Sequence, residues 1–235
     1  MSIKSPEKLY FATAGIPVLT EPRNYENAFN DIVKLGLDGM EVEFVHGVNM
    51  NIETQPLVRK LAGEKKLLLT AHGPYYINLN AQEEEKMQAS VKRILDTARV
   101  AHNFGGYSIT FHAAFYMGGD KDAVFKTVKK KFDEITDTLK KENIKIWVRP
   151  EITGKATQWG DLDEIIKLSK GNDMVLPCID FAHMHARYGG KYNTYDEFAY
   201  IFEKIGKELG DNALNNFHAH VEGINFGPKG EKNHI

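Results

Sequence analysis

Short apolar runs alternate with longer amphipathic segments along the whole chain. Segment 83–104 shows this most clearly, because its apolar residues recur at steps of three and four, as on the buried face of a helix. We interpret the apolar runs as strands, at residues 9–14, 39–45, 67–72, 107–112, 144–151, 174–180 and 216–221. Between them we expect helices at 25–37, 52–65, 83–104, 123–143, 162–170 and 195–209.

This alternation predicts a parallel sheet covered by helices. Seven strands without a glycine-rich dinucleotide fingerprint favour a TIM (β/α)8-type barrel over an open, doubly wound sheet. We expect residues 1–235 to form a single barrel domain, since no linker or low-complexity segment divides them. The eighth strand and helix are missing from the pattern, and the chain is expected to end in a loop. Open strand edges would favour self-association.

Composition and charge narrow the class of protein. Hydrophobic residues make up 42% and charged residues 26%, as in an ordinary globular domain. Cys178 is the only cysteine, so no internal disulfide can form. The chain shows neither a run of about 18 apolar residues nor a signal-peptide core, so we expect a cytoplasmic protein without a membrane partner. The formal net charge of -2 does not by itself indicate nucleic-acid binding.

Histidines and carboxylates follow the expected strands at the end where each strand stops. The carboxyl ends of barrel strands converge on one mouth, so residues distant in sequence become neighbours there. One such histidine is more often a structural residue than a ligand. Five strands with the same feature predict a shared metal site, because imidazole and carboxylate suit zinc, manganese or iron. The candidates are His72, His112, Glu151, Asp180, His183, His185, His218, His220, Glu231 and His234.

Three further residues do not share this pattern. His46 lies in a polar loop and His102 late in a helix, so both are interpreted as structural residues. Cys178 lies inside an apolar strand and is interpreted as a small core residue.

Five segments resemble the endonuclease IV family of apurinic/apyrimidinic-site nucleases, within the xylose isomerase-like barrels. HGPYYINL (72–79) resembles the family's third-strand motif, and PEITGKATQWGDLDEI (150–165) resembles its Glu-x-Thr-x-Gly segment. CIDFAHMHARYGG (178–190) keeps the spacing of its Asp-x-x-His motif. HVEG (220–223), followed by GEKNH (230–234), resembles the seventh-strand histidine and the acidic-x-His pair after it.

The resemblance implies a metal-dependent endonuclease that hydrolyses the phosphodiester 5′ to abasic sites in double-stranded DNA, as in base excision repair. It implies two or three zinc ions, with manganese as an alternative, and Glu151 as the catalytic residue that bridges two of them. The implied metal ligands are His72, His112, Glu151, Asp180, His183, His220, Glu231 and His234. Contacts with DNA are expected from Tyr75, Lys155, Arg187, Lys191, Lys229 and Lys232.

The sequence departs from the family pattern in several places. The acidic-x-His pair is one residue longer here, Glu231 to His234. His218 and His220 compete for one ligand position, and we favour His220. The family's last glutamate has no counterpart, and the loop FVHGVNM (44–50) lacks the basic residues that many members use to enter DNA.

Two other classes of function remain open. Related barrels use Glu, Asp and His around one metal ion to isomerise or epimerise sugars. A catalytically inactive metal-binding homologue is the other alternative. Metal stoichiometry separates the two enzymes, because one bound ion favours the isomerase and two or three favour the nuclease.

Overall fold

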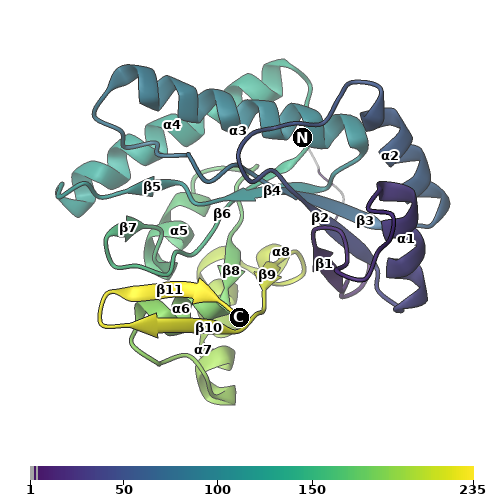
Figure 1. Ribbon diagram of the computed structural model, residues 1–235. Coiled ribbons are helices and arrows are strands. Elements are labelled where there is room, and N and C mark those ends of the chain that lie inside the picture. The colour runs from purple at the N-terminus through teal and green to yellow at the C-terminus, as the bar shows by residue number, and fades with distance from the viewer. Residues whose placement is uncertain (1–2, 4) are drawn as a thin grey trace.

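Parallel β-strands form the centre of the molecule, as the computed structural model shows for residue 3 and residues 5–235 (Figure 1). A five-stranded sheet has the order β1-β2-β3-β4-β6, and β8 pairs in parallel with β9. Parallel bridges from Val148 to Val175 and from Glu151 to Cys178 continue the sheet from β6 toward β8. The strands are β1 (Ala12–Ala14), β2 (Gly39–Glu43), β3 (Leu68–His72), β4 (Ser108–Phe111), β6 (Trp147–Pro150), β8 (Cys178–Asp180) and β9 (His218–His220).

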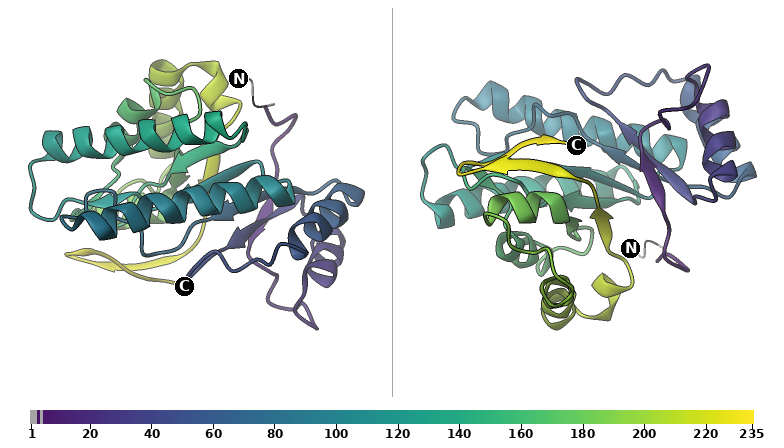
Figure 2. Two further views of the ribbon diagram at one scale, coloured as in Figure 1. Left: turned by 90° about the horizontal axis from the view of Figure 1, so that it is seen from above. Right: turned by 60° about the horizontal axis from the view of Figure 1, so that its bottom comes forward.

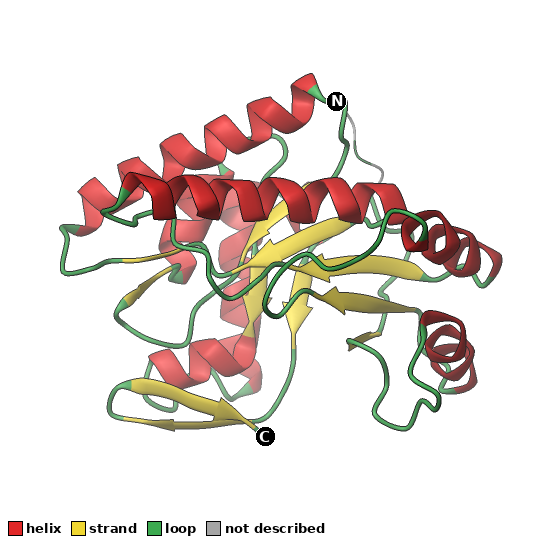
Figure 3. Cartoon of the chain, turned by 45° about the horizontal axis from the view of Figure 1, so that its top comes forward, coloured by secondary structure: helices red, strands yellow, loops and turns green. Residues whose placement is uncertain are grey.

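Helices cover the outer side of these strands (Figures 2 and 3). Polar caps begin several of them: Asn24 caps α1, and Asp161 and Thr194 form capping boxes on α5 and α7. The helices are α1 (Tyr25–Lys34), α2 (Thr54–Glu64), α3 (Glu84–Phe104), α4 (Lys121–Lys141), α5 (Leu162–Ser169), α6 (Phe181–Arg187), α7 (Tyr195–Leu209) and α8 (Asp211–Leu214). The six expected helices are confirmed, with small shifts at their ends.

The apolar core lies between the helices and the outer face of the sheet. Phe29 and Ile32 of α1 and Phe104 of α3 are fully buried there. Phe111 of β4 stacks on Phe132 of α4, with ring centroids 5.8 Å apart. Successive side chains of a strand point to opposite faces of the sheet. Strand residues that alternate with the apolar ones therefore point into the barrel, where they can be polar.

A buried arginine connects the strands at the amino end of the barrel. The guanidinium of Arg149, 1% exposed, donates hydrogen bonds to the carbonyl oxygen of Pro177 and to Oδ1 of Asn216. These two residues lie just before β8 and β9. Arg149 therefore fixes both strands relative to β6, whose carboxyl end leads into Glu151.

Several elements differ from those expected. The expected terminal loop is wrong, because β10 (Ile224–Gly227) and β11 (Gly230–His234) form an antiparallel hairpin. It lies beside α6 (Figure 1). α6 itself begins directly after β8, where only a strand end was expected. The short antiparallel pair β5 (Ala114–Phe115) and β7 (Gln158–Trp159) was also missed.

The barrel class is nevertheless confirmed by the parallel strand order. Among the described residues, no strand pairing joins β9 to β1. The single-domain organisation and the self-association through strand edges stay predictions. No helix in the described part of the chain has the length and apolar character needed to cross a bilayer.

Substitution of two glycines tests how closely the barrel strands approach one another. At Gly39 on β2, an added Cβ would lie 2.1 Å from the carbonyl oxygen of Leu68 on β3. At Gly63 in α2, an added Cβ would meet no atom within 4 Å. We expect Gly39→Ala to lower the free energy of unfolding by more than about 1 kcal/mol. Gly63→Ala should raise it by roughly 0.5–1 kcal/mol, because alanine favours helix. Urea denaturation followed by circular dichroism measures both. Equal effects would contradict the close strand approach.

Candidate metal centre

Glu151 lies at the centre of the candidate site, with its carboxylate 2% exposed. Oε2 lies 3.0 Å from Nε2 of His72 and 3.3 Å from Nε2 of His112. Oε1 lies 3.0 Å from Nδ1 of His220 and 3.4 Å from Nδ1 of His183. Four histidines from separate segments thus surround one buried carboxylate, as the convergence of strand ends predicts.

Asp180 completes the inner part of the site. It is the N-cap of α6, and its Oδ1 accepts a 2.6 Å hydrogen bond from the backbone N–H of His183. This cap directs Oδ2 toward the histidines, 3.2 Å from Nδ1 of His183 and 3.7 Å from Nδ1 of His220. The Asp-x-x-His spacing therefore places both side chains at one end of a short helix.

Two buried atoms of this group are chemically suited to a cation. Oδ2 of Asp180 and Nε2 of His183 are buried and have no hydrogen-bond partner among the described residues. Buried polar atoms are normally satisfied, because leaving one unpaired costs about 1–3 kcal/mol. Carboxylate oxygen and imidazole nitrogen are ligands of zinc and manganese, so these residues fit a metal ion.

Ligand sets of three lie close enough together to hold more than one ion. His72, His112 and Glu151 offer donor atoms within 4.8 Å of one another, and so do Glu151, Asp180 and His183. These two sets share Glu151. The sequence alone therefore predicted the central ligands, although their binding of metal stays a prediction.

A third set of possible ligands lies farther from Glu151. In it, His234 is grouped with Glu222 and His183 rather than with Glu231. His183, Glu222 and His234 offer donor atoms within 4.8 Å, and Nδ1 of His234 lies 2.9 Å from Oε1 of Glu222. Glu231 lies near His183, with Oε2 3.7 Å from Nε2. A Cβ on Gly154 would fall 2.7 Å from Glu231, so the glycine of the Glu-x-Thr-x-Gly segment makes room for it. Sequence reasoning missed Glu222.

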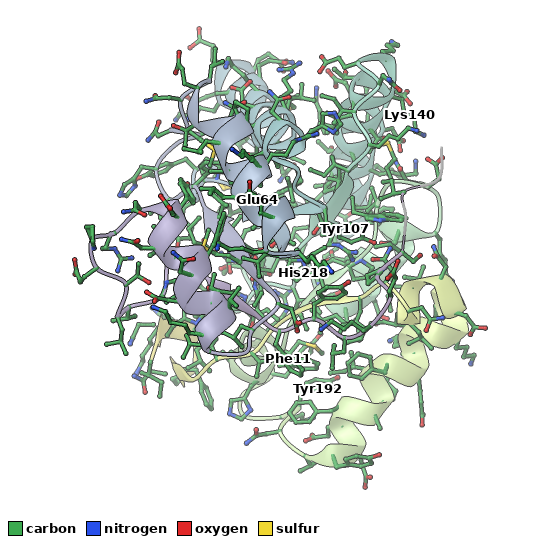
Figure 4. All side chains as sticks on the ribbon, turned by 90° about the vertical axis from the view of Figure 1, so that its right-hand side faces the viewer. Phe11, Glu64, Tyr107, Lys140, Tyr192 and His218 are labelled. Carbon is green, nitrogen blue, oxygen red and sulfur yellow. The ribbon has the colours of Figure 1, made fainter. Side chains whose placement is uncertain are left out.

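Glu41 of β2 is the second residue that sequence reasoning missed. It is 4% exposed, and its Oε1 lies 2.9 Å from Nε2 of His220. Its Oε2 lies 3.3 Å from Nε2 of His218 and accepts a 2.6 Å hydrogen bond from the hydroxyl of Thr70. His220 is thus the histidine of β9 that reaches Glu151 as well as Glu41, whereas His218 contacts Glu41. His218 is labelled near the middle of Figure 4.

Burial and charge together set the protonation of the site. Burial by itself lowers the pKa of His72 and of His183, but Glu151 and the other nearby carboxylates outweigh it and raise each pKa to about 9. Burial would raise the pKa of Glu41, yet His218 and His220 lower it to about 2. Burial lowers the pKa of His218 to about 4. The metal-free site therefore balances buried anions with protonated histidines.

The predicted DNA-contact residues differ in exposure. Tyr75 is 59% exposed and its ring lies 6.1 Å from that of His72, centroid to centroid. Lys155 is half-buried, whereas exposed side chains belong to Lys191, Lys229 and Lys232. Their contacts with DNA stay predictions.

Arg187 is already engaged within the protein. Its Nη1 donates hydrogen bonds to the hydroxyl of Thr153 at 2.9 Å and to the carbonyl oxygen of Lys155 at 2.6 Å. This arginine therefore stabilises the loop after Glu151. A contact with DNA is a prediction that would come in addition to this role.

The remaining histidines and the cysteine lie as follows. His46 stacks on Tyr76, with ring centroids 6.2 Å apart, and His102 lies in α3. His185 faces the carbonyl oxygen of Lys191 rather than Glu151. Cys178 is buried as expected, but its Sγ lies 3.9 Å from Nε2 of His220, next to the site.

The chain belongs to the xylose isomerase-like TIM barrel family, whose model matches residues 29–233. The uncharacterized protein MJ0133 of Methanocaldococcus jannaschii is 40% identical over 227 residues, which cover 97% of this chain and 81% of that protein. The xylose isomerase-like barrel that the motifs indicated is therefore confirmed.

More distant similarities include two kinds of enzyme. A probable endonuclease 4 of Aquifex aeolicus is 26% identical over 185 residues, 76% of this chain and 63% of that protein. Endonuclease IV from Thermus thermophilus has a similar structure, with a TM-score of 0.67 and 16% identity over 91% of this chain and 76% of that one. The structure of a D-tagatose 3-epimerase-like protein is also similar, with a TM-score of 0.70 and 14% sequence identity. The match covers 92% of this chain and 78% of that one. At such identities, these structures show a shared fold.

The shared carboxylate leads to a prediction about metal content. We expect at least two divalent ions per chain after incubation with zinc or manganese. Glu151→Gln should lower this number by about one, because it removes the negative charge common to two ligand sets. Elemental analysis of gel-filtered protein measures the content. A wild-type chain that stays metal-free after such loading would contradict the site.

The histidine pKa values lead to a prediction about the metal-free protein. His72 and His183 have a folded pKa of about 9, above the ordinary value of 6.5. Their ion pairs stabilise the fold fully below pH 6.5, and this stabilisation is lost as the pH rises through about 9. Urea unfolding of chelator-treated protein should therefore show falling stability across this window. His72→Gln should flatten the fall, and an unchanged pH profile would speak against the ion pair.

Proposed function

We propose that the protein is a metal-dependent endonuclease that hydrolyses the phosphodiester 5′ to abasic sites in DNA. The observation that carries this proposal is the linked series of three ligand sets. Glu151 belongs to two of them and His183 to two, so the sets form one continuous chain of donor atoms. Such an arrangement suits two or three ions, which phosphodiester hydrolysis uses more than sugar isomerisation does.

The named relatives support the same reaction. The Aquifex aeolicus protein is a probable endonuclease 4, and an apurinic-apyrimidinic endonuclease of Caenorhabditis elegans is 29% identical over 157 residues. These residues are 64% of this chain and 38% of the Caenorhabditis elegans protein. We infer DNA as the substrate, and base excision repair as the biological context, from the similarity to these two relatives.

Each group of residues has a distinct part in the proposed reaction. Divalent zinc or manganese, when bound, would supply Lewis acidity and favour deprotonation of a water molecule. Glu151 holds His72, His112, His183 and His220 in place and is the proposed catalytic residue. Water oxygen bonds to phosphorus and the bond from phosphorus to the 3′ oxygen breaks, leaving a 3′ hydroxyl and a 5′ phosphate.

Residues at the rim would position the DNA. The exposed ring of Tyr75 lies beside His72, where it can stack against a base or sugar. Lys229 lies in the turn of the terminal hairpin and Lys232 lies on β11, and both are exposed. Their ammonium groups would attract the phosphate backbone despite the overall charge of -2.

A sugar epimerase is the second candidate, and one observation favours it. Burial raises the pKa of Glu43, at the end of β2, to about 7, a value suited to proton transfer near neutral pH. The fold shared with the D-tagatose 3-epimerase-like protein is compatible with this chemistry. An inactive metal-binding homologue is the third candidate, and it would bind metal and cleave nothing.

Cleavage of a synthetic duplex with one abasic site tests the proposed function. The zinc- or manganese-loaded protein should cut the strand 5′ to that site and leave the undamaged duplex intact. Glu151→Gln should lower the rate by at least about 100-fold, since even outer residues of metal sites are worth about 10–100-fold. A loaded protein that epimerises ketoses and leaves the abasic duplex uncut would establish the second candidate instead.

The rim lysines give an electrostatic prediction. The affinity for an abasic-site analogue should fall steeply between about 50 and 200 mM salt, with its logarithm linear in the logarithm of the salt concentration. Lys229→Ala or Lys232→Ala should reduce this slope by about one unit for each lost phosphate contact. Lys130→Ala, on the outer helix α4, is the matched control and should leave the slope unchanged. If both rim variants behave like the control, the hairpin does not contact the backbone.

A further inference from the structure

We propose that Glu41 is a positioning residue that orients His220 so that this histidine coordinates metal through Nδ1. The two nitrogens of the His220 ring face different carboxylates. Nδ1 lies 3.0 Å from Oε1 of Glu151 and 3.7 Å from Oδ2 of Asp180. Nε2 lies on the opposite side, 2.9 Å from Oε1 of Glu41. The inference rests on the metal centre of the proposed function.

The chemistry of imidazole determines which nitrogen is free for a metal ion. A neutral ring carries one proton, and an ionised carboxylate can only accept a hydrogen bond. In the metal-free protein both nitrogens of His220 lie beside a carboxylate, so each can carry a proton. A metal ion held by Glu151 and Asp180 would take the place of the Nδ1 proton, which leaves the remaining proton on Nε2, where it is donated to Glu41. Nδ1 would then offer its lone pair toward Glu151 and Asp180, where the first two ligand sets meet. Carboxylates that hold ligand histidines in this way fix the ring and increase its basicity.

Glu41 is itself held firmly. Its second oxygen accepts a 2.6 Å hydrogen bond from the hydroxyl of Thr70 and lies 3.3 Å from Nε2 of His218. Nδ1 of His218 in turn lies 3.5 Å from the hydroxyl of Ser108. With 4% of its surface exposed, Glu41 has almost no water to replace these partners.

This arrangement explains both histidines of the segment His218-Ala219-His220. Side chains two residues apart on β9 share one face, so both rings point into the barrel. His220 reaches Glu151 and Asp180 through one nitrogen and Glu41 through the other, whereas His218 contacts the second oxygen of Glu41. His218 thus helps to hold Glu41, and Glu41 holds His220. The two histidines of β9 therefore have different roles, and His220 is the one that we assign as a metal ligand.

The test replaces the carboxylate and follows His220 directly. Glu41→Gln should weaken zinc binding by about 10–100-fold, measured by isothermal titration calorimetry with zinc chloride. In the zinc-loaded wild type, ¹⁵N spectra of the imidazoles should show Nε2 of His220 as the protonated nitrogen and Nδ1 as the metal-bound one. In the variant, the Nε2 proton should exchange faster with solvent.

Two variants separate this role from general repacking. Thr70→Val keeps the Glu41 carboxylate but removes its hydrogen bond, so affinity should fall less than in Glu41→Gln. It also serves as the test if Glu41→Gln does not fold. Thr110→Val makes the same change as Thr70→Val at another hydroxyl, one that is fully buried and has no hydrogen-bond partner among the described residues, and should leave zinc affinity close to that of the wild type.

The outcomes distinguish this inference from the proposed function. If the wild type binds zinc and Nε2 of His220 is the metal-bound nitrogen, the inference is overturned and the metal centre stands. Glu41→Gln and Thr70→Val with wild-type affinity and proton exchange would also overturn it. If the wild type binds no zinc at all, the inference and the proposed function fall together.

Discussion

The buried carboxylate of Glu151 constrains the structure more than any other group. It lies at the carboxyl end of β6 and is 2% exposed, and an anion in that position is costly unless it is paired. Its partners, the imidazoles of His72, His112, His183 and His220, come from segments far apart in the chain. Pairing Glu151 therefore requires that the barrel strands be assembled, and the same assembly brings the ligand sets together.

The polar interior of the barrel follows from this constraint. Arg149, two residues before Glu151, holds the amino ends of β8 and β9, while Glu151 holds residues at their carboxyl ends. Glu41 of β2 contacts both histidines of β9. Burial of apolar side chains between the helices and the sheet stabilises the fold. The inner face of the strands can therefore hold charged side chains, which contribute to the site instead of to the apolar core.

Much of this arrangement could be predicted from sequence, because it depends on local periodicity and on one topological rule. Apolar runs marked the seven parallel strands, and the convergence of strand ends predicted which histidines and carboxylates meet. Glu41 could not be found in this way. In the strand GMEVE it reads as an outward-facing polar residue, and only its partners His218 and His220 show that it faces inward. The role of Glu222 likewise depends on its contact with His234, and the hairpin depends on its contacts with α6. Neither contact can be read from the spacing of apolar residues.

The metal centre proposed at the barrel mouth has Glu151 shared between neighbouring divalent ions. Anomalous X-ray diffraction at the zinc edge, from crystals grown with zinc, locates these ions. Separate peaks should appear at the set of His72, His112 and Glu151 and at the set of Glu151, Asp180 and His183. A mouth with no anomalous peak, or with one peak that Glu151 does not contact, would contradict this metal centre.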